Sequence, residues 1–269
     1  MSKGTTKANG QKDSLDRFYT KSEVALQCLN QLQLNRYNCI IEPSAGDGAF
    51  SDLIQNCFAY DISPNKDTIQ QADWFALDKS QFKVHSDILV VGNPPFGQQN
   101  TVAIAFFNEA AKFSDTIAFI LPLSFKKDSI QNRLDLNFSL VKEHKLSNNS
   151  FIFNGADYAV PCIFQIWERT PEPRKRKKLR TTTNLFAFVE KGQADFRIQR
   201  VGGNAGKASF DLDRAAASNY FIKNNSSLSN SQLVELINEL KFPSIEFTVG
   251  PKSLSKGELI ATIEESMGL

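Results

Sequence analysis

A rigid polar corner follows one of the apolar segments of the chain. Asp87–Gly92 (DILVVG) is apolar and β-branched, as is typical of a buried strand, and it leads directly into Asn93, Pro94, Pro95 and Phe96. Two adjacent prolines cannot continue a strand, because each lacks an N–H and has a fixed φ. The corner therefore fixes two hydrogen-bond acceptors, an amide oxygen and a main-chain carbonyl, beside an aromatic ring.

A second group of residues suits a nucleoside-like ligand. Glu42 ends an apolar run and precedes a turn of small residues with Gly46 and Gly48, followed by an expected helix start; glycines let the main chain approach a ligand closely. Asp61 ends the next apolar run, where a carboxylate suits the two hydroxyls of a ribose. The acidic residues Glu42 and Asp47 favour a cationic ligand over phosphates. An ordinary tight turn explains the two glycines equally well.

Alternating strand and helix patterns position these two sites. Apolar, β-branched runs predict buried strands, and apolar residues at helical spacing predict helices, the first of them with Thr20 and Glu23 spaced as a capping box. The predicted strands lie at 37–43, 57–61, 87–92, 115–123 and 159–168, and the helices at 20–34 and 101–113. This order predicts an α/β fold with a largely parallel sheet and helices on both faces.

The pattern changes at 169–184, where prolines and the basic run RKRKK mark a linker or an exposed loop. Alternating β-type stretches and two helices, at 229–242 and 255–267, follow. We therefore expect a disordered leader at 1–15, a domain carrying both sites at 16–170 and a small α+β domain at 171–269. The last segment has 15 Lys/Arg against 11 Asp/Glu, whereas residues 1–170 have 16 against 18, so an anionic partner is expected to engage the C-terminal segment.

Composition narrows the class of protein. The charged and hydrophobic fractions, 22% and 41%, are those of a globular protein, and no apolar run approaches the roughly 20 residues of a membrane span. The N-terminus lacks the apolar region of a signal peptide. Two histidines make a zinc site or a serine–histidine triad unattractive. Reduced, buried thiols in a cytoplasmic protein are expected of the four cysteines, which show no paired metal spacing: Cys28, Cys39, Cys57 and Cys162.

Taken together, EPSAGDGAF (42–50) and NPPF (93–96) resemble the cofactor loop and the catalytic [DN]-P-P-[FYW] motif of S-adenosylmethionine-dependent amino methyltransferases of the N6-adenine type. RFYTKSEVALQCL, QADWFALD and FIFNGADYAVPCIFQIW resemble further motifs of that family, although Lys21 stands where the family has proline. The resemblance covers about residues 18–167, and the motif order is similar to that of the γ subgroup. It implies a Rossmann-like class I sheet, S-adenosylmethionine as cofactor, and a cytoplasmic enzyme of a bacterium or a phage-infected cell.

The resemblance also implies roles for individual residues. Asn93 and Pro94 would accept hydrogen bonds from the target amine, with Pro95 fixing the carbonyl. Phe96 would stack on the target base, and Phe153, or Tyr158 in the same loop, would be the second stacking ring. The residues expected to bind the cofactor are Tyr19, Thr20, Glu42, Pro43, Ser44, Ala45, Gly46, Asp47, Gly48, Phe50, Asp61, Ile62, Asp73, Phe75 and Asn93. Those expected to contact nucleic acid are Arg174, Lys175, Arg176, Lys177, Lys178, Arg200 and Lys207. A solvated loop explains the basic run 174–178 equally well, and a plain glycine-rich hairpin explains Arg200 and Lys207 equally well.

The predicted activity is methyl transfer to the N6 amine of adenine in DNA, with the base flipped out of the stack. The same motif also serves enzymes that methylate base amines in RNA, and a basic segment suits either polymer, so RNA stays open as the alternative. Methylation of a protein glutamine is disfavoured, because that family usually carries its extra domain at the N-terminus. A catalytically silent nucleic-acid-binding module is the alternative from a different class. No metal and no membrane partner is expected.

Overall fold

The computed structural model describes residues 18–153, 155–248 and 250–269. The expected leader at 1–15 lies outside these residues. The chain divides into two compact units. The first comprises the described residues up to Leu121 together with Asn137–Glu172, and the second comprises Pro122–Leu136 together with Pro173–Leu269. The division after Glu172 lies beside the basic run, and the segment Pro122–Leu136 groups with the C-terminal unit despite its place in the sequence.

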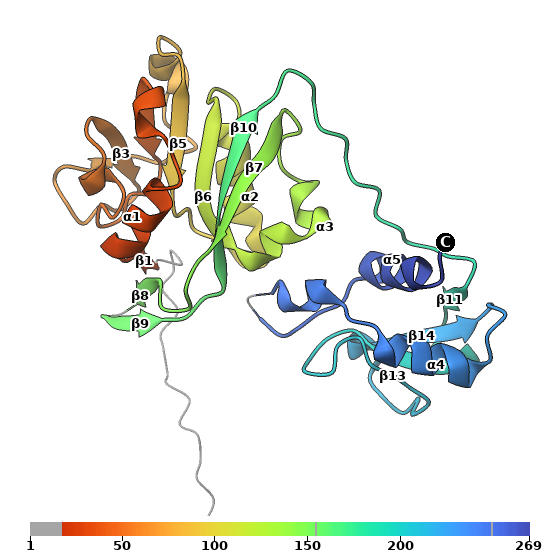
Figure 1. Cartoon of the computed structure of the whole chain (residues 1–269). Coiled ribbons are helices and arrows are strands. Elements are labelled where there is room, and N and C mark those ends of the chain that lie inside the picture. The colour runs from red at the N-terminus through yellow and green to blue at the C-terminus, as the bar shows by residue number, and fades with distance from the viewer. Residues whose placement is uncertain (1–17, 154, 249) are drawn as a thin grey trace, which may run out of the picture. The chain divides into compact units, whose positions relative to one another are not determined.

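Among the described residues, the first unit contains a seven-stranded sheet with the order β4-β3-β2-β5-β6-β10-β7 (Figure 1). Neighbouring strands from β4 to β6 run parallel, and β10 runs antiparallel to β7. The strands are β2 (Cys39–Glu42), β3 (Cys57–Asp61), β4 (Gln70–Gln71), β5 (Ile88–Gly92), β6 (Thr116–Pro122), β7 (Phe138–Lys145) and β10 (Cys162–Arg169). The predicted mixed α/β class is confirmed.

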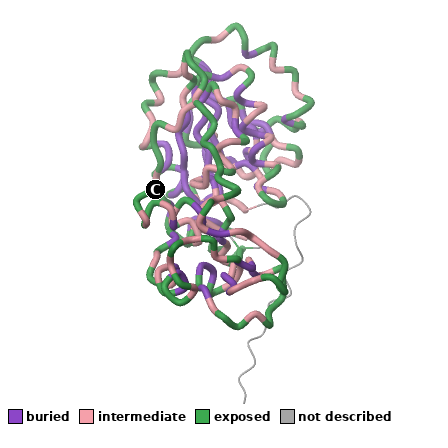
Figure 2. The backbone as a smooth tube through the Cα atoms, turned by 90° about the vertical axis from the view of Figure 1, so that its right-hand side faces the viewer, coloured by how far each residue is buried: buried purple, intermediate pink, exposed green. Residues whose placement is uncertain are grey.

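The central strands carry the core of the first unit. Every residue of β2, β5 and β6 is buried, as expected where helices and loops cover both faces of a parallel sheet. Figure 2 shows the buried backbone running along these strands and the exposed backbone in the connections. The α-helices are α1 (Ser22–Leu29) and α2 (Thr101–Ala110), both within the predicted segments.

Two local predictions in this unit are wrong. Ser51–Leu53 form one 3₁₀ turn instead of the helix expected after the glycine turn, because the chain turns at Asn56 with a φ of 59° and enters β3 at Cys57. The capping box is also absent. Helix α1 starts after Lys21, which makes no side-chain cap, because Thr20 lies in strand β1 (Tyr19–Thr20).

A smaller three-stranded sheet, counted over the described residues, lies beyond one end of the main sheet (Figure 1). β1 pairs antiparallel with β8 (Phe151–Phe153), and β8 pairs antiparallel with β9 (Ala156–Tyr158). Strands β8 and β9 extend the β7–β10 ribbon. The N-terminal strand is therefore attached to the same hairpin that carries Phe153 and Tyr158.

The second unit has its own core. In the part of the chain that the structure describes, its antiparallel sheet has the order β11-β14-β12-β13. Its elements are α3 (Asp128–Gln131), β11 (Phe186–Phe188), β12 (Phe196–Gln199), β13 (Ala208–Ser209), β14 (Asn219–Asn224), α4 (Asn230–Glu239) and α5 (Lys256–Ser266). Helices α4 and α5 begin with complete capping boxes, at Ser229 and Ser255, and their apolar residues share one core with the sheet.

No described helix has the length and apolar character needed to cross a bilayer. The thiols of Cys28, Cys39 and Cys162 are buried and that of Cys57 is half-buried. Burial raises the pKa of Cys28 to about 12 and that of Cys39 to about 11, so these thiols are protonated and unreactive at neutral pH.

Candidate functional site

The chemistry-bearing residues gather at the carboxyl edge of the main sheet. Strands β3, β2 and β5 are neighbours, and they end at Asp61, Glu42 and Gly92. Because they run parallel, the residues that follow all three ends meet at one edge. The topology thus joins the glycine turn to the proline corner, which are far apart in the sequence.

The Asn93 amide is held by the N-terminal strand. Its Nδ2 donates to the Phe18 carbonyl and to the Thr20 hydroxyl, each at 3.1 Å. A carbonyl can only accept, so the nitrogen must face Phe18, and this orientation points Oδ1 away from the strand. Oδ1 is buried and receives no hydrogen bond from any described residue. Nor does a described residue donate to the Pro94 carbonyl.

An unpartnered buried acceptor is costly, by about 1–3 kcal/mol. In a site, such an atom marks a position that a ligand donor can satisfy. The two acceptors that the sequence analysis expected, Asn93 Oδ1 and the Pro94 carbonyl, thus both lack a donor among the described residues. Thr20 has a different partner from the one that the capping box required, namely this amide.

The glycine turn is coupled to the corner and to the N-terminal strand. The Ser44 hydroxyl donates to the Asn93 carbonyl at 3.2 Å. Gly46 has a φ of +57°, and a Cβ there would lie 3.2 Å from the Tyr19 ring, so a larger residue would meet that ring. The Tyr19 hydroxyl accepts from Asn65 at 2.9 Å. Together these contacts form a cradle between β1 and the turn.

The Asp61 carboxylate holds the glycine turn in place. One carboxylate oxygen accepts from Gly46 N and the other from Ser63 N, both at 2.8 Å. A carboxylate offers about four lone-pair positions, so each oxygen can still accept from a ligand hydroxyl. Asp61 can thus fix the turn and bind a ribose at the same time.

Glu42 is a buried acid at the end of β2. It is 2% exposed, and it accepts a hydrogen bond from Ser51 N at 2.8 Å. Burial raises the pKa of Glu42 to about 8, so the group is mostly protonated at neutral pH. Burial also raises the pKa of Asp47 in the same turn. The remaining members of the expected loop are packed more conventionally: Ala45 N donates to Tyr60 O at 2.8 Å, and Phe50 lies in the core at 1% exposure.

The segment after β4 lies beside the end of β3. Ala72 N donates to Asp61 O at 2.9 Å. Asp73 accepts from Phe75 N at 2.9 Å, and the Phe75 ring packs edge-on against Phe106 at 5.0 Å. Ile62 and Phe75 are both exposed, at 54% and 47%, which leaves apolar surface next to the cradle. Trp74, between Asp73 and Phe75, is buried.

Four aromatic rings cluster beside the corner. Phe18 stacks on Tyr158 with a centroid distance of 5.0 Å and an interplanar angle of 13°, and on Phe96 at 6.5 Å and 30°. Phe153 lies 5.5 Å from both Phe18 and Tyr158. The structure thus brings the three expected stacking rings around a fourth, Phe18, which sequence reasoning missed. Its position directly before the expected site residues Tyr19 and Thr20 is the sequence feature that could have indicated it.

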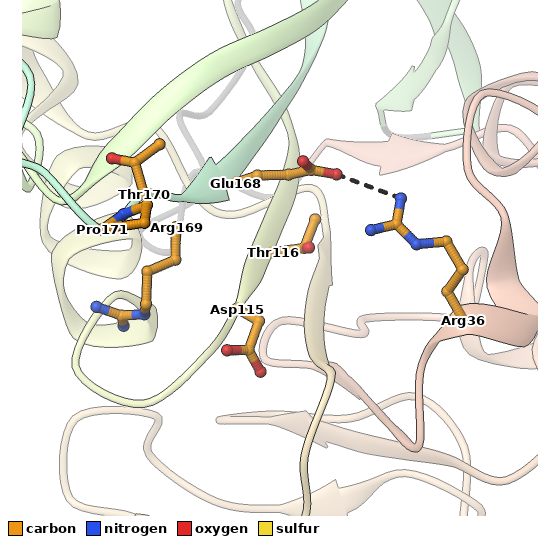
Figure 3. Close-up of a pocket in the computed structure, with 7 residues that line it drawn as sticks. All are labelled: Arg36, Asp115, Thr116, Glu168, Arg169, Thr170 and Pro171. Carbon is orange, nitrogen blue, oxygen red and sulfur yellow. Dashed lines mark hydrogen bonds and ion pairs between the residues drawn. The ribbon is translucent and has the colours of Figure 1, made fainter.

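A cavity of about 380 Å³ lies at the start of β6, away from the carboxyl ends of the parallel strands (Figure 3). Thr116 at the start of β6 and Arg169 at the end of β10 line it, and Arg36 pairs with Glu168 across it at 3.5 Å. None of the expected site residues lines this cavity. The chemistry of the corner therefore has no part in it.

The basic residues of the second unit separate into anchored and exposed groups. Arg174 donates to the carbonyls of Gln131 and Leu134, and Lys177 pairs with Asp128 at 2.6 Å. Lys207 Nζ donates to Asn238 O at 2.7 Å, and Arg200 lies 5.4 Å from the centre of the Tyr220 ring. Lys177 is exposed as well as paired, and the exposed members of the run that form no ion pair with a described residue are Lys175, Arg176 and Lys178.

Comparison with known proteins gives a family match and distant structural similarities. The model of the family described as "EDM2 methyltransferase-like domain" matches residues 34–172. The protein ENHANCED DOWNY MILDEW 2 of Arabidopsis thaliana is 26% identical over 161 residues, which are 54% of this chain and 12% of the plant protein. This chain thus spans a small part of that relative.

Similar solved structures include the 23S rRNA methyltransferase ErmE, at 14% identity and a TM-score of 0.42, over 58% of this chain and 71% of that one. A modification subunit of a putative type I restriction enzyme from Vibrio vulnificus has 15% identity and a TM-score of 0.42, over 61% and 46% of the two chains. A putative RNA methyltransferase from Pyrococcus horikoshii has 15% identity and a TM-score of 0.40, over 58% and 88%. These similarities are too distant to indicate a substrate.

Proposed function

The chain belongs to the EDM2 methyltransferase-like domain family, and from this premise we propose that it transfers a methyl group from S-adenosylmethionine to the N6 amine of adenine in DNA. The observation that carries the proposal is the buried Asn93 Oδ1, which has no donor among the described residues although both N–H groups of the same amide are used. An atom held in this way is ready to accept from a ligand amine.

The cradle fits S-adenosylmethionine. Asp61 keeps lone pairs for ribose hydroxyls, and Ile62 and Phe75 offer apolar surface to an adenine ring. Glu42 is mostly protonated at neutral pH, so the charge attraction to a cationic ligand that the sequence suggested does not come from this residue. Tyr19 and Ser44 close the cradle toward the corner. When bound there, the cofactor supplies an electrophilic methyl group on a sulfonium.

The corner supplies the activation of the amine. The lone pair of an exocyclic aromatic amine is delocalised into its ring, which makes the amine a poor nucleophile. Hydrogen bonds from its two N–H groups to Asn93 Oδ1 and to the Pro94 carbonyl favour a tetrahedral nitrogen whose lone pair is localised and aimed. Phe96 offers a stacking face beside these acceptors.

Nucleic acid is the proposed partner because of the basic run. Lys175, Arg176 and Lys178 are exposed and free to meet phosphates. DNA is the proposed polymer and RNA is the alternative outcome of the test. The cytoplasmic location expected from the sequence stays a prediction.

The test is transfer of tritiated methyl from S-adenosylmethionine to duplex DNA, single-stranded DNA and RNA in parallel, followed by mapping of the methylated atom. N6-methyladenine in DNA is the expected product, and Asn93→Ala is the negative control. Methylation of RNA alone would replace DNA as the substrate. A thermal shift with S-adenosylmethionine but no transfer to any polymer would indicate the silent binding module.

A further inference from the structure

We propose that the Phe18 ring fills the slot for the target base, and that it must swing out before methyl transfer, while the Phe18 carbonyl stays in place and keeps the Asn93 amide oriented. This inference rests on the proposed function. It assigns two roles to one residue: its ring gates the slot, and its main chain positions the catalytic amide.

The contacts of the ring support the first role. Phe18 stacks on Tyr158 at 5.0 Å and on Phe96 at 6.5 Å, with interplanar angles of 13° and 30°, and both partners are candidate stacking rings for the target base. No ring contact joins Phe96 directly to Tyr158 in the part of the chain that the structure describes, and Phe18 contacts both of them. A flat ring stacked in this way has the contacts that a flipped base would make.

The hydrogen bonds support the second role. Phe18 O and Thr20 Oγ1 together accept both N–H groups of Asn93. The strand itself is tied down by pairing with β8 and by the ion pair of Lys21 with Asp157, at 2.9 Å. Rotation about the Phe18 Cα–Cβ bond can therefore remove the ring without releasing the carbonyl.

The buried acceptor explains why the ring must move. Asn93 Oδ1 is inaccessible as well as unpartnered, so an incoming amine can reach it only after neighbouring atoms shift. Among the residues bonded to this amide, Phe18 is the one with a side chain in the slot. The closed ring thus lowers the apparent affinity for the target by the fraction of molecules that are open.

Phe18→Ala removes the ring and keeps the carbonyl. On the DNA substrate and target position identified for the wild type, we expect KM to fall by about three- to tenfold with kcat unchanged or higher, since one stacked ring is displaced. Phe18→Trp offers a larger stacking surface and should shift KM in the opposite direction. Ile152→Ala is the matched control, because Ile152 lies opposite Tyr19 on the same hairpin and has no part in the ring cluster.

A second measurement does not depend on turnover. Duplex DNA with 2-aminopurine at the target position is mixed with each protein at the concentration that half-saturates Phe18→Ala. The fluorescence change should be larger with Phe18→Ala than with wild type, because a larger fraction of the base enters the slot. S-adenosylhomocysteine binding, measured by calorimetry, should be equal in both and confirms that the variant is folded.

The outcomes separate the two proposals. If the wild type transfers methyl to DNA but Phe18→Ala raises KM or lowers kcat tenfold, Phe18 is a wall of the slot and the gate is wrong. Equal shifts in Phe18→Ala and Phe18→Trp would also overturn the gate, as would an unchanged KM. If the wild type transfers methyl to no polymer, the proposed function fails and this inference fails with it.

Discussion

Single side-chain atoms carry the proposed chemistry. Asn93 has both amide N–H groups bonded and its oxygen without a donor among the described residues, whereas both Asp61 oxygens accept hydrogen bonds and keep further lone pairs. The free oxygen of Asn93 suits the amine of a substrate, which binds there only for the reaction. The carboxylate of Asp61, already fixed by two hydrogen bonds, suits the ribose of a bound cofactor. The roles proposed for these two residues therefore differ in what a mutation should change.

We expect Asn93→Ala to lower methyl transfer by roughly a hundredfold or more, because one oriented acceptor of the target amine is lost. Affinity for S-adenosylhomocysteine should stay within a few-fold of wild type, measured by calorimetry. Gln98→Ala is the control, since Gln98 is exposed shortly after the corner. An Asn93→Ala enzyme with most of its activity would remove Asn93 from the reaction.

Glu42 predicts a pH dependence of stability. Burial raises the pKa of Glu42 from its ordinary value of 4.5 to about 8, so the folded state holds a proton that the unfolded state has released. The free energy of unfolding should therefore fall as the pH rises from about 4.5 to about 8, by an amount of order a few kcal/mol.

Glu42→Gln should flatten that dependence and make the variant more stable than wild type near pH 8, because the amide stays neutral. Urea denaturation at pH 5, 6.5 and 8 measures both effects. Parallel curves for the two proteins would show that Glu42 does not titrate in this range.

At the scale of elements, the ends of three parallel strands explain why the site exists. β3, β2 and β5 deliver Asp61, the glycine turn and the corner to one edge, and β1 covers that edge from the N-terminal side. The cradle is thus held by hydrogen bonds between these elements, and in one of them the Gly46 N–H donates to the Asp61 carboxylate.

We expect Asp61→Ala to weaken S-adenosylhomocysteine binding at least tenfold, because the turn loses its anchor and the ribose loses its acceptor. Nucleic-acid affinity should not change. Asp67→Ala is the matched control, since Asp67 is an exposed carboxylate in the following loop. Unchanged cofactor affinity in a folded Asp61→Ala protein would place the ribose acceptor elsewhere.

At the scale of the whole molecule, the proposed function assigns the chemistry to one unit and substrate binding to the other. All residues of the corner and the cradle belong to the first unit, and the basic run belongs to the second. Two members of that run, Arg174 and Lys177, bond to the segment Pro122–Leu136 of the same unit. The phosphate contacts are therefore expected from Lys175, Arg176 and Lys178, which are exposed and form no ion pair with a described residue.

Replacing Lys175, Arg176 and Lys178 with serine should weaken binding to all DNA sequences alike. The slope of log affinity against log salt should become shallower by up to about three, because each phosphate contact releases roughly 0.9 counterion. Fluorescence anisotropy at several salt concentrations measures this slope, on a duplex with the preferred target site and on random DNA.

The matched control removes three exposed lysines that are dispersed over the chain: Lys83, Lys142 and Lys241. An equal change in slope for both triple variants would show that the basic run contributes only through the net charge of the protein. A loss confined to the preferred site would make it part of sequence readout.

Local patterns in the sequence were enough to predict the central strands, the corner and the positions of helices α4 and α5. The apolar runs of β2, β3, β5 and β6 report burial directly, two prolines impose the corner, and Ser229 and Ser255 meet the capping requirements of helices that follow them at once. Each of these features depends on residues within a few positions of one another.

The tertiary structure alone decided what Phe18, Thr20 and Arg174 do. Thr20 looked equally suited to cap a helix, and its hydroxyl instead accepts from an amide 73 residues away. Phe18 and Tyr158 meet only because β1 pairs with β8, and Arg174 is anchored by carbonyls 40 and 43 residues earlier. Contacts of this kind depend on how distant segments pair and pack, and a hydrogen-bonding or aromatic side chain in a sequence is compatible with many such partners.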